Sequence, residues 1–232
     1  MTISTYGVVA LLPMKAHSAR VSGKNFRPFA GKPLFRWILD SLLDVPQIER
    51  VVINTDARSV LAENGLLDGD AGGRIMIRDR KPEICGDFVS MNLVLADDVA
   101  AVAADCYVMT HTTNPLLSSD TIVKAISEYS AARRDGRADS LFAVNKIQTR
   151  FYAADGRPIN HDPDNLVRTQ DLEPWFEENS NLYVFDRDSF ASTEARIGRQ
   201  PILFETPPLE SIDIDDQPQW VMAEALALHG RG

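Results

Sequence analysis

Short apolar runs alternate along the chain with stretches in which apolar residues recur every three or four positions. Gly7–Pro13 (GVVALLP) is a continuous apolar run, too short for a membrane helix. Runs of this length are typical of a strand that is covered on both faces. Similar runs occur at Arg50–Thr55, Arg74–Ile77 and Cys106–Thr110. These four runs predict a parallel sheet between two layers of helices.

The stretches between these runs have the spacing of helices. Pro33–Leu43 places its apolar side chains on one helical face, and a proline is tolerated in a first turn. Ala57–Asn64, Phe88–Ala104 and Ser119–Arg133 are further predicted helices. The alternation of strands and helices indicates an α/β fold, with a Rossmann-like, mainly parallel sheet flanked by helices.

The second half of the chain follows this pattern less regularly. Ser140–Val144 and Asn181–Phe185 predict strands, Ser211–Ile214 predicts a strand at the sheet edge, and Pro218–Leu228 predicts a closing helix. The pattern is broken between residues 145 and 178, where three prolines are mixed with aromatic residues. We therefore expect one domain over residues 1–232, with 145–178 as a protruding subdomain or subunit contact.

Composition narrows the classes of partner. The 232 residues are 44% apolar and 25% charged, and 24 Lys and Arg against 33 Asp and Glu give a net charge of −9. An acidic chain is unsuited to nonspecific binding of nucleic acid, which needs a cationic face. Two cysteines, Cys85 and Cys106, cannot form a structural zinc site alone. With no membrane-spanning run and no cleavable leader, a cytoplasmic protein with no membrane partner is expected.

A cluster of cations follows the first predicted strand, where α/β sheets bind their ligands. The nineteen residues from Met14 to Lys32 contain Lys15, Arg20, Lys24, Arg27 and Lys32. Such a loop can wrap a polyphosphate with backbone N–H groups and cationic side chains, or it can be merely a solvated basic loop. Because neither a Walker A motif nor G-x-G-x-x-G is present, a P-loop ATPase and a dinucleotide enzyme are disfavoured.

A pair of carboxylates lies near the end of the chain. In the sequence ESIDIDDQ, Asp213 and Asp215 are two residues apart and share a face if the segment is a strand, while Ile212 and Ile214 point into the core. Adjacent carboxylates repel each other unless a cation lies between them. Oxygen ligands at a phosphate site favour Mg²⁺, although the pair could also be two exposed acids at the end of a strand.

Five segments, in order along nearly the whole chain, resemble the acylneuraminate cytidylyltransferases, the CMP-sialic acid synthetase family, and the related CMP-Kdo synthetases. They are the basic loop S-x-R-x-x-G-K-N, Arg80 seven residues before Asp87, Thr113–Leu116, Asn179–Val184 and Ser211–Asp215. The resemblance implies a fold of the nucleotide-diphospho-sugar transferase type with a small dimerisation insertion. It also implies an enzyme that joins CTP to the anomeric hydroxyl of an acidic sugar, with Mg²⁺ as cofactor, release of pyrophosphate, and a homodimer.

The resemblance assigns the triphosphate end of CTP to the basic loop. Lys24 and Asn25 match the nucleotide-binding Lys-Asn of the family, and Ser18 lies in the loop around the phosphates. Lys15 stands where the family usually has an arginine that contacts the triphosphate, and Arg20 is expected to contribute to the same contact. An ammonium group cannot make the planar two-pronged contact of a guanidinium group.

The same resemblance assigns the base and the metal. Arg80 and Ser90 match positions that line the cytidine pocket, and Asp213 and Asp215 match the metal-binding aspartates. Together with Lys15 and Lys24, the two aspartates are the expected catalytic residues, because nucleotidyl transfer depends mainly on positioning and on neutralising phosphate charge.

Four residues are expected at the sugar. Asn179 matches the asparagine of the family's Asn-Gly segment, and Arg168 with Gln170 resembles its Arg-x-Gln, whose arginine faces the sugar carboxylate. His111 stands where the family often has glutamine, and Ser180 replaces the glycine after the asparagine. These departures leave open which nonulosonic acid is the acceptor, with sialic, legionaminic and pseudaminic acids as alternatives.

Other functions remain open from the sequence. One alternative is a nucleotidyltransferase for another base or acceptor, such as a guanylyltransferase or a Kdo-type enzyme. Another is a catalytically silent homologue that binds CTP, which the intact Asp213 and Asp215 pair disfavours. A small-molecule binding module without a nucleotide is disfavoured by the five cations of the basic loop.

Overall fold

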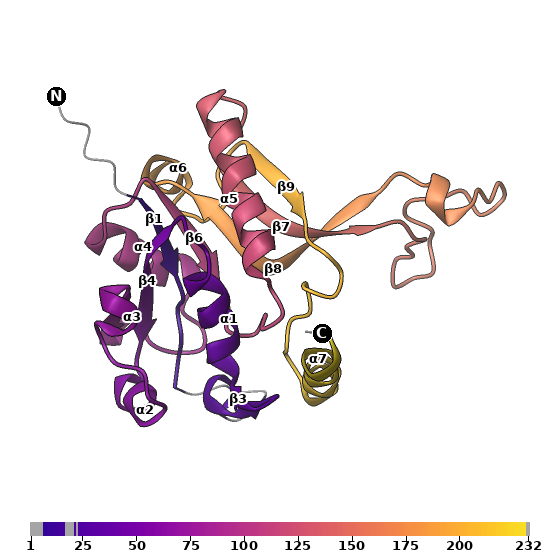
Figure 1. The fold of residues 1–232 in the computed structure, drawn as a ribbon. Helices are drawn as coiled ribbons and strands as arrows, with labels where there is room; N and C mark the ends of the chain where they lie inside the picture. The colour runs from indigo at the N-terminus through magenta and orange to yellow at the C-terminus, as the bar shows by residue number, and fades with distance from the viewer. Residues whose placement is uncertain (1–6, 17–20, 22, 231–232) are drawn as a thin grey trace.

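The computed structural model describes residues 7–16, 21 and 23–230. Its main sheet contains β1 (Val8–Leu11), β4 (Ile48–Thr55), β5 (Ile75–Asp79), β6 (Cys106–Thr110), β7 (Ser140–Ile147), β8 (Trp175–Phe185) and β9 (Pro201–Glu205). The strand order is β5-β4-β1-β6-β8-β7-β9 (Figure 1). Strands β5, β4, β1 and β6 are mutually parallel, and β8 runs antiparallel to both of its neighbours. The predicted mainly parallel sheet is therefore confirmed.

Helices cover both faces of this sheet. They are α1 (Leu34–Leu43), α2 (Arg58–Glu63), α3 (Asp70–Gly73), α4 (Met91–Ala101), α5 (Ser119–Arg134), α6 (Arg187–Thr193) and α7 (Gln217–His229). Residues of α1 and α5 pack into one core with one set of alternating strand residues, and residues of α4 and α6 pack into a second core with the opposite set. The short 3₁₀ helices are Lys24–Phe26, Pro82–Ile84 and Thr169–Asp171.

A third cluster joins the end of the chain to its beginning. Trp220 of α7 is almost fully buried, and its ring packs edge-on against Phe29, with the ring centroids 5.3 Å apart. Phe29 lies in β2 (Pro28–Phe29), which pairs with β3 (Lys32–Pro33) just before α1. Because this cluster also buries Ile214, it fixes the 211–215 segment beside the basic loop.

The elements around the end of the sheet differ from the prediction. Ser211–Ile214 is not a strand, although Ile214 and Ile212 pack into the third cluster as their alternation predicted. The sheet edge is instead β9, which was not predicted, and it is largely exposed. An edge strand with few buried side chains carries too weak an alternation to be recognised in sequence.

Residues 148–174 form an arm between β7 and β8 that projects from the body of the molecule (Figure 1, orange). Strand β8 begins at Trp175, well before the predicted Asn181, and it pairs with β7 as far as Ile147 opposite Trp175. The Trp175 ring stacks on Phe151 at the base of the arm, with the centroids 4.9 Å apart. The protruding segment is thus the tip of a long β7–β8 hairpin.

The hairpin contains a local break in strand β8. Phe142 of β7 pairs with Tyr183, whereas Val144 pairs with Glu178, so extra residues of β8 bulge between these pairs. Ser180 lies in this bulge with a φ of 56°, a left-handed conformation that is uncommon for residues other than glycine. The bulge turns the side chain of Asn179 toward Asn145 and Thr206 rather than along the regular sheet face.

Candidate functional site

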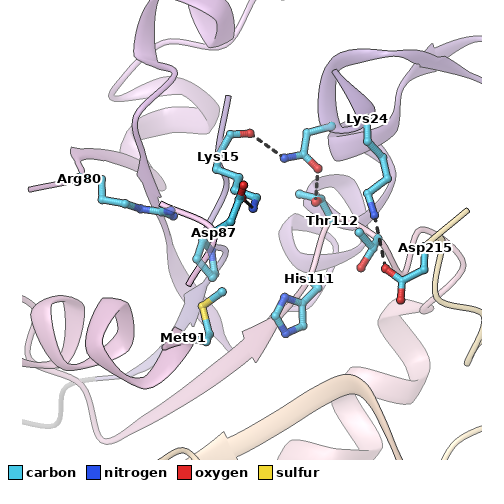
Figure 2. Close-up of a pocket in the computed structure, with 11 residues that line it drawn as sticks. Lys15, Lys24, Arg80, Asp87, Met91, His111, Thr112 and Asp215 are labelled. Carbon is cyan, nitrogen blue, oxygen red and sulfur yellow. Dashed lines mark hydrogen bonds and ion pairs between the residues drawn. The ribbon is translucent and has the colours of Figure 1, made fainter. Parts of the chain in front are cut away.

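A cavity of about 320 Å³ opens at the carboxyl ends of β1, β5 and β6, where a ligand site was expected. Its lining residues come from the segments that follow these strands, from α4 and from the 211–215 segment. They are Pro13, Lys15, Lys24, Asn25, Arg80, Asp87, Met91, His111, Thr112, Thr113 and Asp215 (Figure 2). Six of the residues predicted from sequence are therefore brought together in one cavity: Lys15, Lys24, Asn25, Arg80, His111 and Asp215.

Lys15 lies at the exposed side of this cavity. Its ammonium group forms an ion pair with the carboxylate of Asp87, from the loop that follows β5. The backbone carbonyl of Lys15 accepts a hydrogen bond from Asn25 Nδ2 at 2.9 Å, and Asn25 Oδ1 accepts one from Thr112 Oγ1 at 2.6 Å (Figure 2). Asn25 thus connects the segments after β1 and β6, and its side chain is positioned by protein contacts on both ends.

Lys24 is a buried cation on the opposite side. Only 6% of the residue is exposed, and its Nζ donates to the carbonyl of Ile214 and lies 3.8 Å from Asp215 Oδ1. A buried ammonium group is unfavourable unless it is paired and hydrogen-bonded. These two contacts, together with the 2.9 Å hydrogen bond from Ile214 N to the carbonyl of Thr113, hold the 211–215 segment against the cavity.

Arg80 follows β5 and is fixed by three hydrogen bonds. Its Nε donates to Asn54 Oδ1 at 3.0 Å, and its Nη2 donates to the carbonyls of Asn54 at 2.8 Å and Met14 at 3.3 Å. Because a guanidinium group is planar, these bonds fix the direction of the whole group. Its charge is thus presented to the cavity in a defined orientation (Figure 2).

His111 lies between Lys24 and Met91 on the floor of the cavity (Figure 2). Burial lowers the pKa of His111 from its ordinary value of 6.5 to about 3, and the charges of Arg196 and Lys24 add to this effect. The imidazole is therefore neutral at neutral pH and is a weak base. It is suited to hydrogen bonding with a polar ligand rather than to general-base catalysis, which needs a pKa near the operating pH.

The two aspartates predicted to bind Mg²⁺ lie in different cavities. Asp215 lines the cavity described above, whereas Asp213 lines a neighbouring one with Asn179 and Ser180. Within the described ranges, no group of three or more His, Cys, Asp or Glu side chains could hold a metal ion. Mg²⁺ is commonly held by one or two carboxylates together with water and substrate phosphates, so the exposed carboxylate of Asp215 fits a metal that arrives with a nucleotide.

The remaining predicted residues lie outside this cavity. Ser90 caps the N-terminus of α4 and lines an adjoining cavity with Arg196, and Asn179 is held in the bulge of β8. Arg168 and Gln170 lie on the arm, where Arg168 forms an ion pair with Asp171 at 2.7 Å. Within one chain, neither of these arm residues lines the cavity.

Two further predicted residues, Ser18 and Arg20, lie outside the described residues. Asp87 and Thr112 also line the cavity, and neither was predicted from the sequence as a site residue, although Asp87 is part of a segment that carries the resemblance. Thr112 lies two residues after the predicted strand Cys106–Thr110, so its place beyond a strand end was the available signal. Nothing in the spacing of Asp87 indicated that it would pair with Lys15, because 72 residues separate them.

Comparisons with known proteins agree with this geometry. Residues 9–217 match a protein family described as "Cytidylyltransferase". The chain is 26% identical to N-acylneuraminate cytidylyltransferase of Oncorhynchus mykiss over 95% of its own length, but it spans only about half (50%) of that relative. It is 25% identical to CMP-N,N'-diacetyllegionaminic acid synthase of Legionella pneumophila, with 94% of this chain and 95% of the relative covered. The predicted resemblance is therefore confirmed.

The fold is also found in solved structures. CMP:2-keto-3-deoxy-manno-octonic acid synthetase in complex with CTP superposes with a TM-score of 0.66 at 16% identity, covering 97% of this chain and 99% of the other. A 4-diphosphocytidyl-2C-methyl-D-erythritol synthase gives a TM-score of 0.65 at 11% identity, covering 96% and 100%. At these identities the likeness concerns the fold alone.

None of the helices in the described residues has the length and apolar character needed to cross a membrane.

The neutral state of His111 predicts a pH dependence of stability. The unfolded chain binds a proton at His111 near pH 6.5, whereas the folded chain does so only near pH 3. Between these values the unfolded chain holds more protons, so the free energy of unfolding falls as the pH is lowered. In urea unfolding between about pH 6 and 4.5, His111→Gln should make this fall shallower, by up to about 1.4 kcal/mol per pH unit. Equal slopes for the two chains would contradict the burial of a neutral imidazole.

Proposed function

The chain belongs to the cytidylyltransferase family, and on that premise we propose that it transfers CMP from CTP to the anomeric hydroxyl of an acidic, nonulosonic sugar. The observation that carries this proposal is the convergence of Lys15, Lys24 and Arg80 on one cavity of an otherwise acidic chain. Three cations, two from the basic loop and one that follows β5, complement the charge of a nucleoside triphosphate.

The reaction forms one bond and breaks one. The anomeric oxygen attacks the α-phosphorus of CTP, the bond from that phosphorus to the bridging oxygen breaks, and pyrophosphate leaves with those electrons while the hydroxyl proton is released. The protein's part is to hold the reactants in line and to stabilise the charge that moves toward the leaving group. In this proposal Lys15 and Lys24 act at the phosphates, and Arg80 holds the nucleoside end.

Magnesium is the cofactor proposed for this reaction. Asp215 would hold the ion from inside the cavity, and Asp213 would approach it from the neighbouring cavity. When bound, Mg²⁺ would neutralise phosphate charge and favour departure of pyrophosphate. The buried ammonium of Lys24 lies beside Asp215 and keeps that carboxylate in place on the cavity wall.

The acceptor is proposed from the relatives and from the polar groups beside the cavity. Curated relatives include a legionaminic acid synthase and a pseudaminic acid cytidylyltransferase of Campylobacter jejuni, which is 22% identical. His111, as a neutral imidazole, can donate or accept a hydrogen bond from a sugar hydroxyl without a charge change. Asn179 lies in the neighbouring cavity with Asp213 and extends the polar surface available to the sugar.

We further propose that the arm reaches a second copy of the chain, giving a homodimer. Arg168 and Gln170 lie on the arm and away from the cavity of their own chain, so they can meet a sugar only in the site of a partner. The arm also exposes apolar side chains, namely Tyr152, Ile159, Leu166 and Val167. Apolar side chains gathered on a projecting segment are typical of an interface.

The dimer is tested by the molar mass in solution. Leu166→Asp combined with Val167→Asp should convert a dimer to a monomer in light scattering, because two charges would be buried without partners. Leu67→Asp, at an exposed apolar position between α2 and α3, is the control and should leave the mass unchanged. A monomeric wild-type chain, or a dimer that tolerates both substitutions, would contradict the proposed role of the arm.

The function is tested by pyrophosphate release. Each of the four NTPs is supplied with Mg²⁺ and with a panel of nine-carbon and eight-carbon acidic sugars. We expect release with CTP and one nonulosonic acid, because the proposal assigns the cations of the cavity to the nucleotide and the polar groups beside them to the sugar. Release with GTP or with Kdo would favour a guanylyltransferase or a Kdo-type enzyme, and CTP binding without release across the panel would favour a silent homologue.

The placement of the two aspartates predicts unequal roles. Asp215→Ala should lower kcat by about 10²–10³-fold without unfolding the chain, a loss comparable to removing a group that stabilises transition-state charge. Asp213→Ala, which alters the neighbouring cavity, should lower kcat less. Asp44→Ala, at the exposed end of α1, is the control. Near-normal turnover of Asp215→Ala in a Mg²⁺-dependent assay would remove the proposed metal role.

A further inference from the structure

A buried polar network lies beneath the cavity on the side of Arg80. Asn54, near the end of β4, and Asp98, in α4, are both fully buried. Asn54 Nδ2 donates to Asp98 Oδ1 at 2.8 Å, and Asn54 Oδ1 accepts from Arg80 Nε at 3.0 Å. A continuous chain of hydrogen bonds thus leads from a helix through a strand to a side chain of the cavity.

The orientation of the Asn54 amide is set chiefly by Asp98, at 2.8 Å, with a longer contact of 3.5 Å from Asn54 Nδ2 to Asp97 Oδ2. Asp98 Oδ1 is an acceptor that receives both Asn54 Nδ2 and Arg78 Nη1. If the amide were reversed, its oxygen would face a carboxylate oxygen and its NH₂ group would face the donors of Arg80. Arg78 in turn holds the helix end of the network, because its Nη2 also pairs with Asp97 at 2.8 Å.

This orientation determines how Arg80 meets a ligand. Its Nε and Nη2 are occupied by Asn54 and Met14, and within the part of the chain that the structure describes no group accepts a hydrogen bond from Nη1. A guanidinium group carries two N–H donors on Nη1, in the same plane as the others. Because Arg80 lines the cavity, those two donors are available to an acceptor that enters it.

Packing alone does not explain a polar residue at position 54. Residues two apart on a strand share a face, and Val52 packs against Leu95 and Val99 of α4 in the second core. An apolar side chain at position 54 could extend this contact, whereas burying an amide and a carboxylate carries a desolvation cost. Buried ion pairs are also weak sources of stability compared with apolar packing.

We infer that Asn54 is a positioning residue for nucleotide recognition: oriented by Asp98, it holds the Arg80 guanidinium so that Nη1 meets a hydrogen-bond acceptor of the bound nucleotide. The inference rests on the proposed function in taking CTP as that nucleotide. Asn54 lies behind Arg80 and does not line the cavity itself, so it acts only through Arg80. Its loss should therefore weaken nucleotide binding and have no separate effect in a chain that lacks Arg80.

A double-mutant cycle tests this dependence. Binding of CTP with Mg²⁺ is measured by calorimetry for the wild-type chain, Asn54→Leu, Arg80→Ala and the double variant. Asn54→Leu should weaken CTP binding about tenfold when Arg80 is present, the loss expected for one hydrogen bond to a charged group. In the Arg80→Ala background the same substitution should change the affinity less than about twofold, since the two residues act as one unit.

Two further variants distinguish a specific effect on CTP binding from a general loss of structure. Val52→Ala, on the same strand face, removes core packing but no contact to Arg80, and it should lower the melting temperature while leaving CTP affinity unchanged. Asp98→Asn keeps the shape of the side chain but removes its charge and replaces one acceptor oxygen with an NH₂ donor, so it constrains the direction of the Asn54 amide less strongly. Asp98→Asn should weaken CTP binding only when Arg80 is present. If Asn54→Leu does not fold, the cycle that combines Asp98→Asn with Arg80→Ala tests the inference in its place.

Equal losses of affinity with and without Arg80 would overturn the inference, because they would show a merely structural role. Unchanged affinity of both Asn54→Leu and Asp98→Asn would overturn it as well. The cycle measures CTP binding and not turnover. A chain that binds CTP but uses no acidic sugar would therefore contradict the proposed function and leave this inference intact. A wild-type chain without CTP binding would overturn both.

Discussion

The buried ammonium group of Lys24 connects the parts of the site that are farthest apart in sequence. Its contacts with the carbonyl of Ile214 and the carboxylate of Asp215 bring the 211–215 segment to the basic loop, 190 residues away. A buried cation requires such partners, since an unpaired one carries a large desolvation cost. The third apolar cluster, which buries Ile214 and Trp220, supports this contact from behind. The position of Asp215 in the cavity therefore depends on the contacts of Lys24, on the hydrogen bond from Ile214 N to the carbonyl of Thr113, and on the packing beneath them.

The sequence was sufficient for the parallel half of the sheet because its central strands, β1 and β6, are buried almost entirely on both faces. Runs such as Cys106–Thr110 contain almost nothing but apolar residues, and the residues that follow them, His111 among them, could be assigned to the ligand-binding edge. The edge strand β9 was missed because it has only five residues and carries an apolar residue, Leu203, on its exposed face, which removes the alternation expected of a half-buried strand. The prediction of a strand at Ser211–Ile214 was wrong, because the alternation of Asp and Ile there arises from packing against α7 and not from pairing in the sheet.

Contacts between distant residues limited what could be predicted of the site itself. Asn54 lies inside an apolar run and looked like part of a buried strand, and its hydrogen bonds to Asp98 and Arg80 depend on how α4 and the end of β5 meet. The separation of Asp213 from Asp215 likewise follows from the path of an irregular segment. Arg168 was recognised by resemblance alone, and its place on the arm separates it from the cavity of its own chain.

The charged groups of the cavity surround an uncharged one. Lys15 and Arg80 lie on one side and Lys24 lies on the other (Figure 2), and each is held by a protein acceptor or carboxylate before any ligand arrives. Asp87 and Asp215 line the same cavity, so part of this positive charge is balanced within the protein. His111 lies between Lys24 and Met91 and is kept uncharged by burial and by the charges of Arg196 and Lys24. A protonated His111 would add a positive charge beside Lys24, and like charges at close range disfavour the charged form. The cations around the imidazole therefore keep the floor of the cavity an uncharged polar contact.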